Sequence, residues 1–222
     1  MTTIDIIQQL LSQEDIASIR FAKFDKSHYI QDNPSISKVS LKVIDNALEI
    51  KKLFDLPFWS AVNIANCQLS DWSQELIALS DHHNESYYFE VSDINTVKDI
   101  SLDPNLGINS RVILASGEVR HIPMLDFHIK HFEHSLDLVR LICRQLNQRS
   151  GYILDSGASY HYVGNELLNE DAFISFLAHS LLFSPIVDNR WVAHQLLERS
   201  ATLRVGKKND VFPLIIESLN FR

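Results

Sequence analysis

The sequence predicts an α+β protein with a small mixed or antiparallel sheet and packed helices, and three observations support this. Segments with helical spacing of apolar residues alternate with segments of strand character along the chain. No internal repeat, low-complexity tract or linker interrupts the 222 residues. Hydrophobic residues make up 45% and charged residues 22%, as in globular proteins with a sizeable core. We therefore expect one domain over residues 1–222, mostly helical over 1–100, with the chemical motifs in a core over 110–216.

The N-terminal part contains three predicted helices and one predicted strand. Apolar residues recur at helical spacing over residues 4–11, over Val43–Phe54 and over Ser70–Leu79. A turn is predicted over Asp81–Asn84 because of its polar composition. Ser86–Val91 then alternates like a strand.

A β-hairpin is predicted in the middle of the chain. Arg111–Ala115 and Val119–Ile129 have strand character and are separated by Ser116-Gly117-Glu118, a suitable hairpin loop. Side chains alternate between the two faces of a strand. Asp126 and His128 are therefore expected to share one face of the second strand.

The C-terminal part interleaves helices and short apolar segments. A helix is predicted over residues 136–146, with Gly151 as a left-handed terminator, followed by a strand through Ile153. The other predicted elements are helices over 173–181 and 190–198 and apolar segments over 203–205 and 212–219.

Composition limits the location and partners of the protein. No apolar run reaches the roughly 18 to 20 residues that span a bilayer, and the N-terminus lacks the basic start of a signal peptide. We therefore expect a cytoplasmic protein that does not contact a membrane. The net charge of −8 opposes indiscriminate adhesion to nucleic acid but allows a local basic groove.

Cysteine and histidine spacing indicates no structural zinc. Cys67 and Cys143 stand far apart and lack any Cys or His at zinc-ligand spacing. Near the second predicted strand, His128, His131 and His134 lack the carboxylate of an HExxH motif. A solvated loop after that strand is the simpler interpretation.

The segment over residues 153–162 supports two incompatible interpretations. In the first, Asp155-Ser156-Gly157 after an apolar strand resembles the catalytic turn of retroviral-type aspartic proteases. Two such carboxylates must share one proton to activate water. No second Asp-Ser/Thr-Gly is present, so this hypothesis requires a dimer. The simpler interpretation of Asp155 is a solvated turn residue.

The second interpretation combines three separated motifs. Residues 122–126 are an apolar run that ends in Asp126, Ser159-Tyr160-His161 is a small-x-His strand, and Asp188 precedes Leu203-Arg204. In that order they resemble the archaeo-eukaryotic primase superfamily, and the flanking residues resemble its branch of small bacterial primase-like proteins.

This resemblance implies an RRM-like catalytic core and template-directed nucleotidyl transfer that depends on Mn²⁺ or Mg²⁺. Hard cations of this kind require clustered carboxylate oxygens. The implied partners are a nucleoside triphosphate and nucleic acid. The implied roles are Asp126 and Asp188 in catalysis, Asp126, His128 and Asp188 in metal binding, and Ser159, His161, Arg204 and Lys207 in nucleotide binding.

One departure from the family pattern opens an alternative. The family has a second carboxylate two residues after its first, where this chain has His128. Imidazole suits Mn²⁺ better than Mg²⁺ and removes one negative charge. The alternative is therefore a catalytically degenerate module that binds nucleic acid or a partner. Asp188 also has two interpretations, because it precedes a helical segment and suits an N-cap as well as a metal ligand.

Overall fold

The computed structural model describes residues 3–12, 15–23, 38–67, 87–93, 106–206 and 212–221. The chain divides into two compact units, Met1–Lys23 with Tyr87–Arg222 (unit 1) and Phe24–Ser86 (unit 2). The single domain over residues 1–222 stays a prediction. The predicted helix over Ser70–Leu79 and the turn over Asp81–Asn84 lie outside the described residues.

The described part of unit 2 is a pair of helices, α2 (Lys38–Phe54) and α3 (Phe58–Cys67). Its core consists of Val43, Ala47, Ala61, Val62 and Ala65. Helix α2 covers the predicted helix over residues 43–54, and a short connection through residues 55–57 joins it to α3. Small residues at the contact let two helices pack closely.

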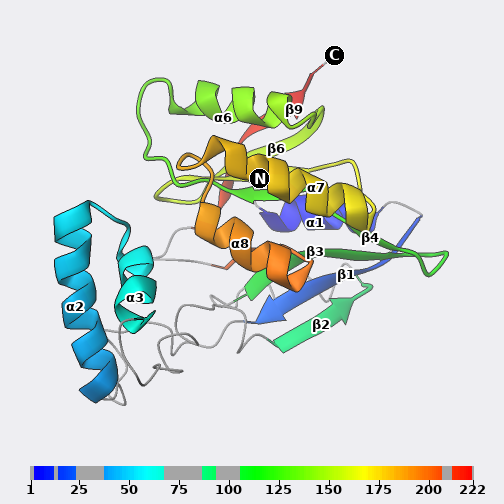
Figure 1. The fold of residues 1–222 in the computed structure, drawn as a ribbon. Coiled ribbons are helices and arrows are strands. Elements are labelled where there is room, and N and C mark those ends of the chain that lie inside the picture. Colours follow the sequence, from blue (N-terminus) through cyan, green and yellow to red (C-terminus); the bar gives the residue numbers. More distant parts are fainter. Residues whose placement is uncertain are drawn as a thin grey trace. The chain divides into compact units, whose positions relative to one another are not determined.

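Unit 1 confirms the predicted α+β class (Figure 1). Its elements in chain order are α1 (Thr3–Leu11), β1 (Ile16–Lys23), β2 (Tyr87–Val91), β3 (Leu106–Leu114), β4 (Val119–His121), β5 (Met124–Asp126), α6 (Ser135–Gln145), β6 (Ser150–Asp155), β7 (Tyr160–Gly164), α7 (Glu170–Ser180), the 3-10 helix η2 (Leu181–Phe183), α8 (Asn189–Glu198), β8 (Thr202–Arg204) and β9 (Leu214–Asn220).

The strands form two antiparallel sheets. The first, here named the β3 sheet, has the order β2-β1-β3-β4, and β8 also pairs with β3. The second, the β7 sheet, has the order β5-β7-β6-β9. Apolar residues of both sheets belong to one core cluster, together with α1, α6, α7 and α8. The two sheets therefore fold as one unit.

The predicted second strand of the hairpin, Val119–Ile129, is wrong as a single strand. Its first part, β4, pairs with β3, whereas its second part, β5, pairs with β7 in the other sheet. Pro123 stands at the crossover and has no N–H to donate. The N–H of Ile122 still donates to Ser110 O of the β3 sheet, whereas Pro123 O already accepts from Gly164 of the β7 sheet.

Gly151 does not terminate the preceding helix. It lies inside β6 with φ +154°, and the left-handed residue after α6 is Asn147 with φ 57°. A Cβ atom at position 151 would lie 2.6 Å from Val163 O and 2.7 Å from Cε2 of Tyr162. Glycine is needed there because the buried Tyr162 ring packs directly against the strand backbone.

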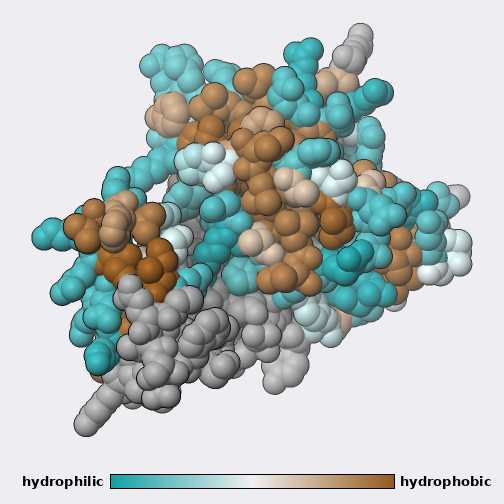
Figure 2. Space-filling model, viewed as in Figure 1, coloured by the Kyte–Doolittle hydropathy of each residue, from teal (hydrophilic) through white to brown (hydrophobic). Residues whose placement is uncertain are grey.

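The 3-10 helix η2, directly after α7, and helix α8 expose apolar side chains. Leu182, just after α7, is 78% exposed, and Leu197 of α8 is 81% exposed. Brown side chains gather over these two helices in Figure 2. Among the described residues, no helix has the length and apolar character needed to cross a bilayer.

Candidate functional site

Strand β5 places Asp126 beside His161 of β7. The two residues are register partners, so their side chains share one face of the β7 sheet. Oδ1 of Asp126 lies 3.5 Å from Nε2 of His161. The Asp126 side chain is 30% exposed and that of His161 is 9% exposed. The carboxylate therefore reaches solvent while the imidazole is nearly enclosed.

The chain beyond β5 pairs with the segment that precedes α8. Phe127 and Val187 form an antiparallel bridge, and both are buried. The N–H of Asp188 donates to Asp126 O at 3.0 Å. Neighbours of bridge partners stand opposite one another and point away from the partners' face. Asp126 and Asp188 therefore stand side by side, on the opposite face from Phe127 and Val187.

Asp188 is also the N-cap of α8. Its Oδ1 accepts hydrogen bonds from the N–H groups of Arg190 at 3.0 Å and Trp191 at 2.9 Å. Its Oδ2 lies 3.9 Å from Nδ1 of His128, whose side chain is 79% exposed. The predicted cap is present. Because the cap uses Oδ1, it orients the carboxylate with Oδ2 on the side of His128.

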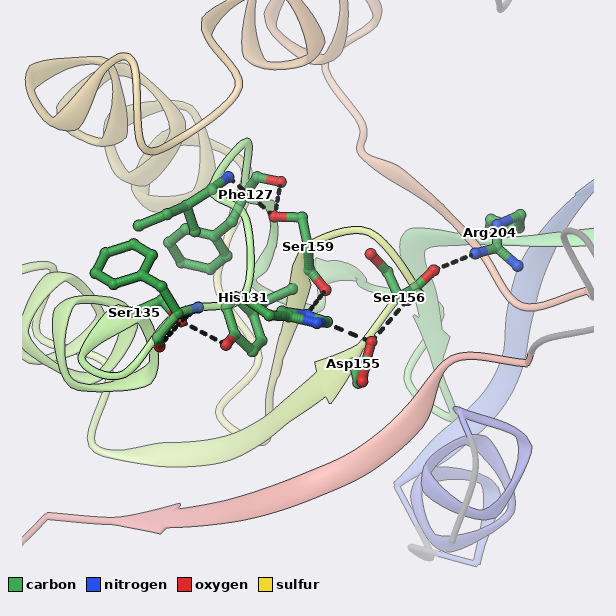
Figure 3. Close-up of polar contacts among 11 residues, drawn as sticks. Phe127, His131, Ser135, Asp155, Ser156, Ser159 and Arg204 are labelled. Atoms are coloured by element: carbon green, nitrogen blue, oxygen red, sulfur yellow. Dashed lines mark hydrogen bonds and ion pairs between the residues drawn. The ribbon is translucent and has the colours of Figure 1, made fainter.

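Arg204 belongs to the β3 sheet and contacts the turn between β6 and β7. It stands at the end of β8, opposite Gly107 of β3. Nη2 donates to Ser156 O at 2.8 Å, and Nη1 donates to Gly206 O. These bonds hold the planar guanidinium against the turn over residues 156–159 between β6 and β7 (Figure 3).

Ser159 stands at the other end of the same turn (Figure 3). Its hydroxyl donates to Phe127 O at 2.5 Å and accepts from the N–H of Ile129 at 3.0 Å. Both partners belong to the backbone that directly follows Asp126. Lys207, which was predicted to bind nucleotide, lies outside the described residues.

The carboxylate pair suits a cation that the protein shares with a phosphate ligand. Within the described ranges, no three His, Cys, Asp or Glu side chains already converge as metal ligands. Mg²⁺ in proteins is usually held by one or two carboxylates plus water and substrate phosphates, so a complete protein cage is not required. Asp126 and Asp188 fit that arrangement, and His128 beside them adds a donor that suits Mn²⁺.

His131 has a structural role that its sequence context does not indicate. Nε2 lies 3.1 Å from Ser159 O and 3.5 Å from Oδ1 of Asp155. Its ring lies 4.6 Å from the Tyr160 ring. No spacing in the sequence signals these contacts, because the partners stand on the neighbouring turn and strand. Asp155 itself closes a turn, since Oδ1 accepts from the N–H of Gly157 at 2.7 Å.

This antiparallel α+β unit brings together two carboxylates and a histidine on the next strand, and an arginine contacts the β6–β7 turn; these are residues that the resemblance to primases indicated. A family model described as archaeo-eukaryotic primase 1D-like (AEP-like) matches residues 88–214, more than half of the chain. The chain therefore belongs to this primase family, and the predicted resemblance is confirmed. No curated protein and no solved structure matches the chain.

Family membership supports a primase-like function of the nucleotidyltransferase type, and an interaction with nucleotides or nucleic acid, at the level of the family. All predicted site residues from Asp126 to Lys207 fall inside the matched segment. The family gives the aspartic protease hypothesis no support.

Proposed function

We propose that this protein binds a nucleoside triphosphate and a divalent cation at the Asp126–Asp188 pair and transfers the nucleotide to a template-paired nucleic acid strand. The single observation that carries the proposal is the position of these two carboxylates, side by side with His161 at 3.5 Å from Asp126. Clustered carboxylates beside a hydrogen-bond donor suit the charge of a triphosphate and its cation.

In this proposal, each residue has a separate task. Asp126 and Asp188 would hold the cation, with His128 as a third ligand. Mn²⁺ or Mg²⁺ bound there would offset the charge of the triphosphate and would lower the pKa of the attacking 3′ hydroxyl. His161 donates a hydrogen bond to a phosphate oxygen, while Arg204 and Lys207 balance the remaining charge. The 3′ hydroxyl loses its proton to solvent water, and its oxygen bonds to the α-phosphorus as the bond to pyrophosphate breaks.

The charge of the site favours a single cation and Mn²⁺ over Mg²⁺. His128 stands where the family has a carboxylate, so the site has less negative charge. One oxygen of Asp188 is already used by the cap of α8. Imidazole is a softer ligand and suits Mn²⁺.

The cytoplasmic location stays a prediction.

A second candidate function is nucleotide or nucleic-acid binding without transfer. The observation that favours it is again His128, because loss of one carboxylate weakens two-metal catalysis more than it weakens phosphate binding. In this version Arg204 and His161 keep their roles, while the carboxylate pair no longer activates a hydroxyl.

Nucleotide titration tests the proposed site. A fluorescent nucleoside triphosphate is titrated into wild type, Asp126→Ala and Asp171→Ala in the presence of Mn²⁺. Asp171, an exposed carboxylate in the first turn of α7, serves as the matched control. We expect Asp126→Ala to weaken binding at least about tenfold, the size of a lost interaction between charged groups, and Asp171→Ala to change nothing. Equal affinities in wild type and Asp126→Ala would remove the site.

Primer extension separates the two candidate functions. Wild type and His128→Asp are compared on a primed template with Mn²⁺ and with Mg²⁺. The first function is supported if wild type extends the primer with Mn²⁺ and His128→Asp also extends it with Mg²⁺. Nucleotide binding without extension in either protein supports the second. Unchanged cation affinity in His128→Asp would contradict both.

A further inference from the structure

We propose that the β6–β7 turn over residues 156–159 positions the site, and that Ser159 acts through the backbone after Asp126 instead of contacting phosphate. This inference rests on the proposed function, and it assigns Ser159 a different role from the nucleotide ligand that the family pattern implies. Figure 3 shows the turn between its two sets of partners, with Arg204 at Ser156 and Phe127 at Ser159.

The hydroxyl of Ser159 is used twice by the strand that carries the carboxylate. It donates to Phe127 O at 2.5 Å and accepts from the N–H of Ile129 at 3.0 Å. A serine hydroxyl has one proton to donate, and here Phe127 O receives it. A phosphate oxygen also requires a donor, so it would have to replace Phe127 O. The geometry therefore favours a positioning role.

The two bonds hold the backbone on both sides of His128. Asp126 precedes this segment directly, and its own O accepts from Asp188. The ladder that sets the two carboxylates side by side ends at Phe127 and His128. Beyond that point, the Ser159 hydroxyl gives the strand its next contacts. A shift of this segment would move Asp126, His128 and Asp188 together.

The other end of the turn holds the cationic side. Ser156 O accepts from Nη2 of Arg204 at 2.8 Å. Inside the turn, the N–H of Ser156 donates to Ser159 O at 3.0 Å, which joins its two ends. Gly157 adopts φ +97°, a conformation that glycine accepts without strain. One short turn therefore contacts both the carboxylate strand and the arginine.

His131 also contacts the turn, at the main-chain oxygen of Ser159. Ser159 O can only accept, so Nε2 of His131 must donate the proton in their 3.1 Å contact. The carboxylate of Asp155 lies 3.5 Å from the same nitrogen and favours that proton. Tyr160, next in the chain, donates its hydroxyl to Ser135 of α6 at 2.7 Å, because Ser135 Oγ already donates to Phe132 O.

Hydrogen exchange in the ligand-free protein tests the positioning role directly. The variants are Ser159→Ala and, as the conservative rescue, Ser159→Thr. We expect Ser159→Ala to speed exchange at the Ile129 amide about fivefold and to change the side-chain resonance of Arg204, because a lost hydrogen bond of about 1 kcal/mol loosens both ends. Ser159→Thr keeps the hydroxyl and restores both signals. Unchanged exchange at Ile129 would overturn the inference, whatever ligand the protein binds.

Nucleotide affinity tests whether the turn matters to the site. With Mn²⁺ and a fluorescent triphosphate, we expect about tenfold weaker binding in Ser159→Ala and near wild-type binding in Ser159→Thr. Urea unfolding measured in parallel shows that both variants stay folded. Faster exchange with unchanged affinity would overturn the positioning role. If wild type itself does not bind the nucleotide, the proposed function fails, and the exchange result alone decides whether the turn holds the two segments.

A second pair of variants acts from outside the turn. His131→Gln keeps an N–H donor for Ser159 O but loses the ring, whereas His131→Phe keeps a ring against Tyr160 but loses the donor. We expect weaker nucleotide binding, about threefold to tenfold, only in His131→Phe. Weaker binding in His131→Gln with near wild-type binding in His131→Phe would show that ring packing, and not the donated hydrogen bond, holds the turn.

Discussion

The two sheets of unit 1 are stabilised in different ways, although they share one core cluster. The β7 sheet has apolar residues and a close backbone contact at its centre, with Tyr162 packed against Gly151. The β3 sheet instead contains several buried polar residues: Asn109, Ser110, His121 and Thr202, with Gln195 and Ser200 beside β8, whereas the β7 sheet has His161. The candidate carboxylate Asp126 belongs to the β7 sheet and Arg204 to the β3 sheet.

This difference indicates how the strand with Asp126 and the strand with Arg204 are each held in position. The apolar sheet holds Asp126 and His161 through a regular ladder, which tolerates little change in volume. The polar sheet holds β8 and Arg204 through directional hydrogen bonds, which depend on protonation and on every partner being present. We therefore expect packing changes to disturb the β7 sheet most. Polar substitutions and pH changes should disturb the β3 sheet most.

The largest expected effect is a packing change in the β7 sheet. Gly151→Ala introduces a Cβ 2.6 Å from Val163 O and 2.7 Å from the Tyr162 ring. We expect a loss of about 4 kcal/mol of unfolding free energy, measured by denaturant titration. Gly117→Ala is the control, because φ is +84° but nothing lies within 4 Å, and it should cost only about 1 kcal/mol. Similar losses in both variants would contradict the close-packing argument.

The next effect is a pH response of the β3 sheet. The pKa of His121 is lowered from 6.5 to about 4, mainly by burial; Glu170 opposes the shift, and Arg111, Arg20 and Arg199 add to it. Between these values the unfolded chain binds a proton that the folded protein does not. Stability is therefore fully present above pH 6.5 and falls as the pH drops toward 4, by on the order of 3 kcal/mol.

Variants at two histidines test this pH response. Nδ1 of His121 lies 3.1 Å from Oγ of Ser110, and its ring stacks on the Phe173 ring with centroids 4.5 Å apart. His121→Gln should remove most of the stability loss between pH 6.5 and 4, measured by urea unfolding at several pH values. His134→Gln, at a 72% exposed side chain, should retain it. An unchanged pH slope in His121→Gln would show that other groups cause the acid sensitivity.

A smaller effect is expected from one amide in the β3 sheet. The side chain of Asn109 donates to Ser200 at 3.1 Å and to Thr202 at 2.9 Å, and it accepts from the N–H of Arg111. Asn109→Ala leaves these buried groups without that partner, so we expect a loss of about 2 kcal/mol in thermal or urea unfolding. Asn189→Ala, at an exposed position, should stay within about 0.5 kcal/mol of wild type.

The smallest effect concerns the ion pair between α6 and the β7 sheet. Arg140 reaches Glu217 through Nε and Nη2, at 2.7 Å and 2.6 Å. Arg140→Lys loses this two-point contact and should cost about 0.5 to 1 kcal/mol, less at high salt. Arg144→Lys on the same helix should have no measurable effect. A loss as large as that of Asn109→Ala would mean that the β7 sheet also depends on polar contacts.

Much of the local structure follows from the sequence. Apolar periodicity correctly predicts α6, α7, α8 and the strand through Ile153, because each of these elements buries one side of a regular repeat. It does not indicate β1, which lies between β2 and β3 and is buried at positions on both faces, so no alternation is visible. It also does not show that Pro123 divides one apparent strand between two sheets.

For the candidate site, sequence motifs alone indicate the candidate residues and their order along the chain: Asp126, His161, Asp188 and Arg204. Only the tertiary structure placed Asp188 beside Asp126, used the Ser159 hydroxyl for the strand backbone and gave His131 its contact with the turn. The sequence does not show these contacts because they join residues that are far apart in the chain. Periodicity and motifs report a residue's immediate neighbours, whereas these contacts are hydrogen bonds between segments far apart in the chain.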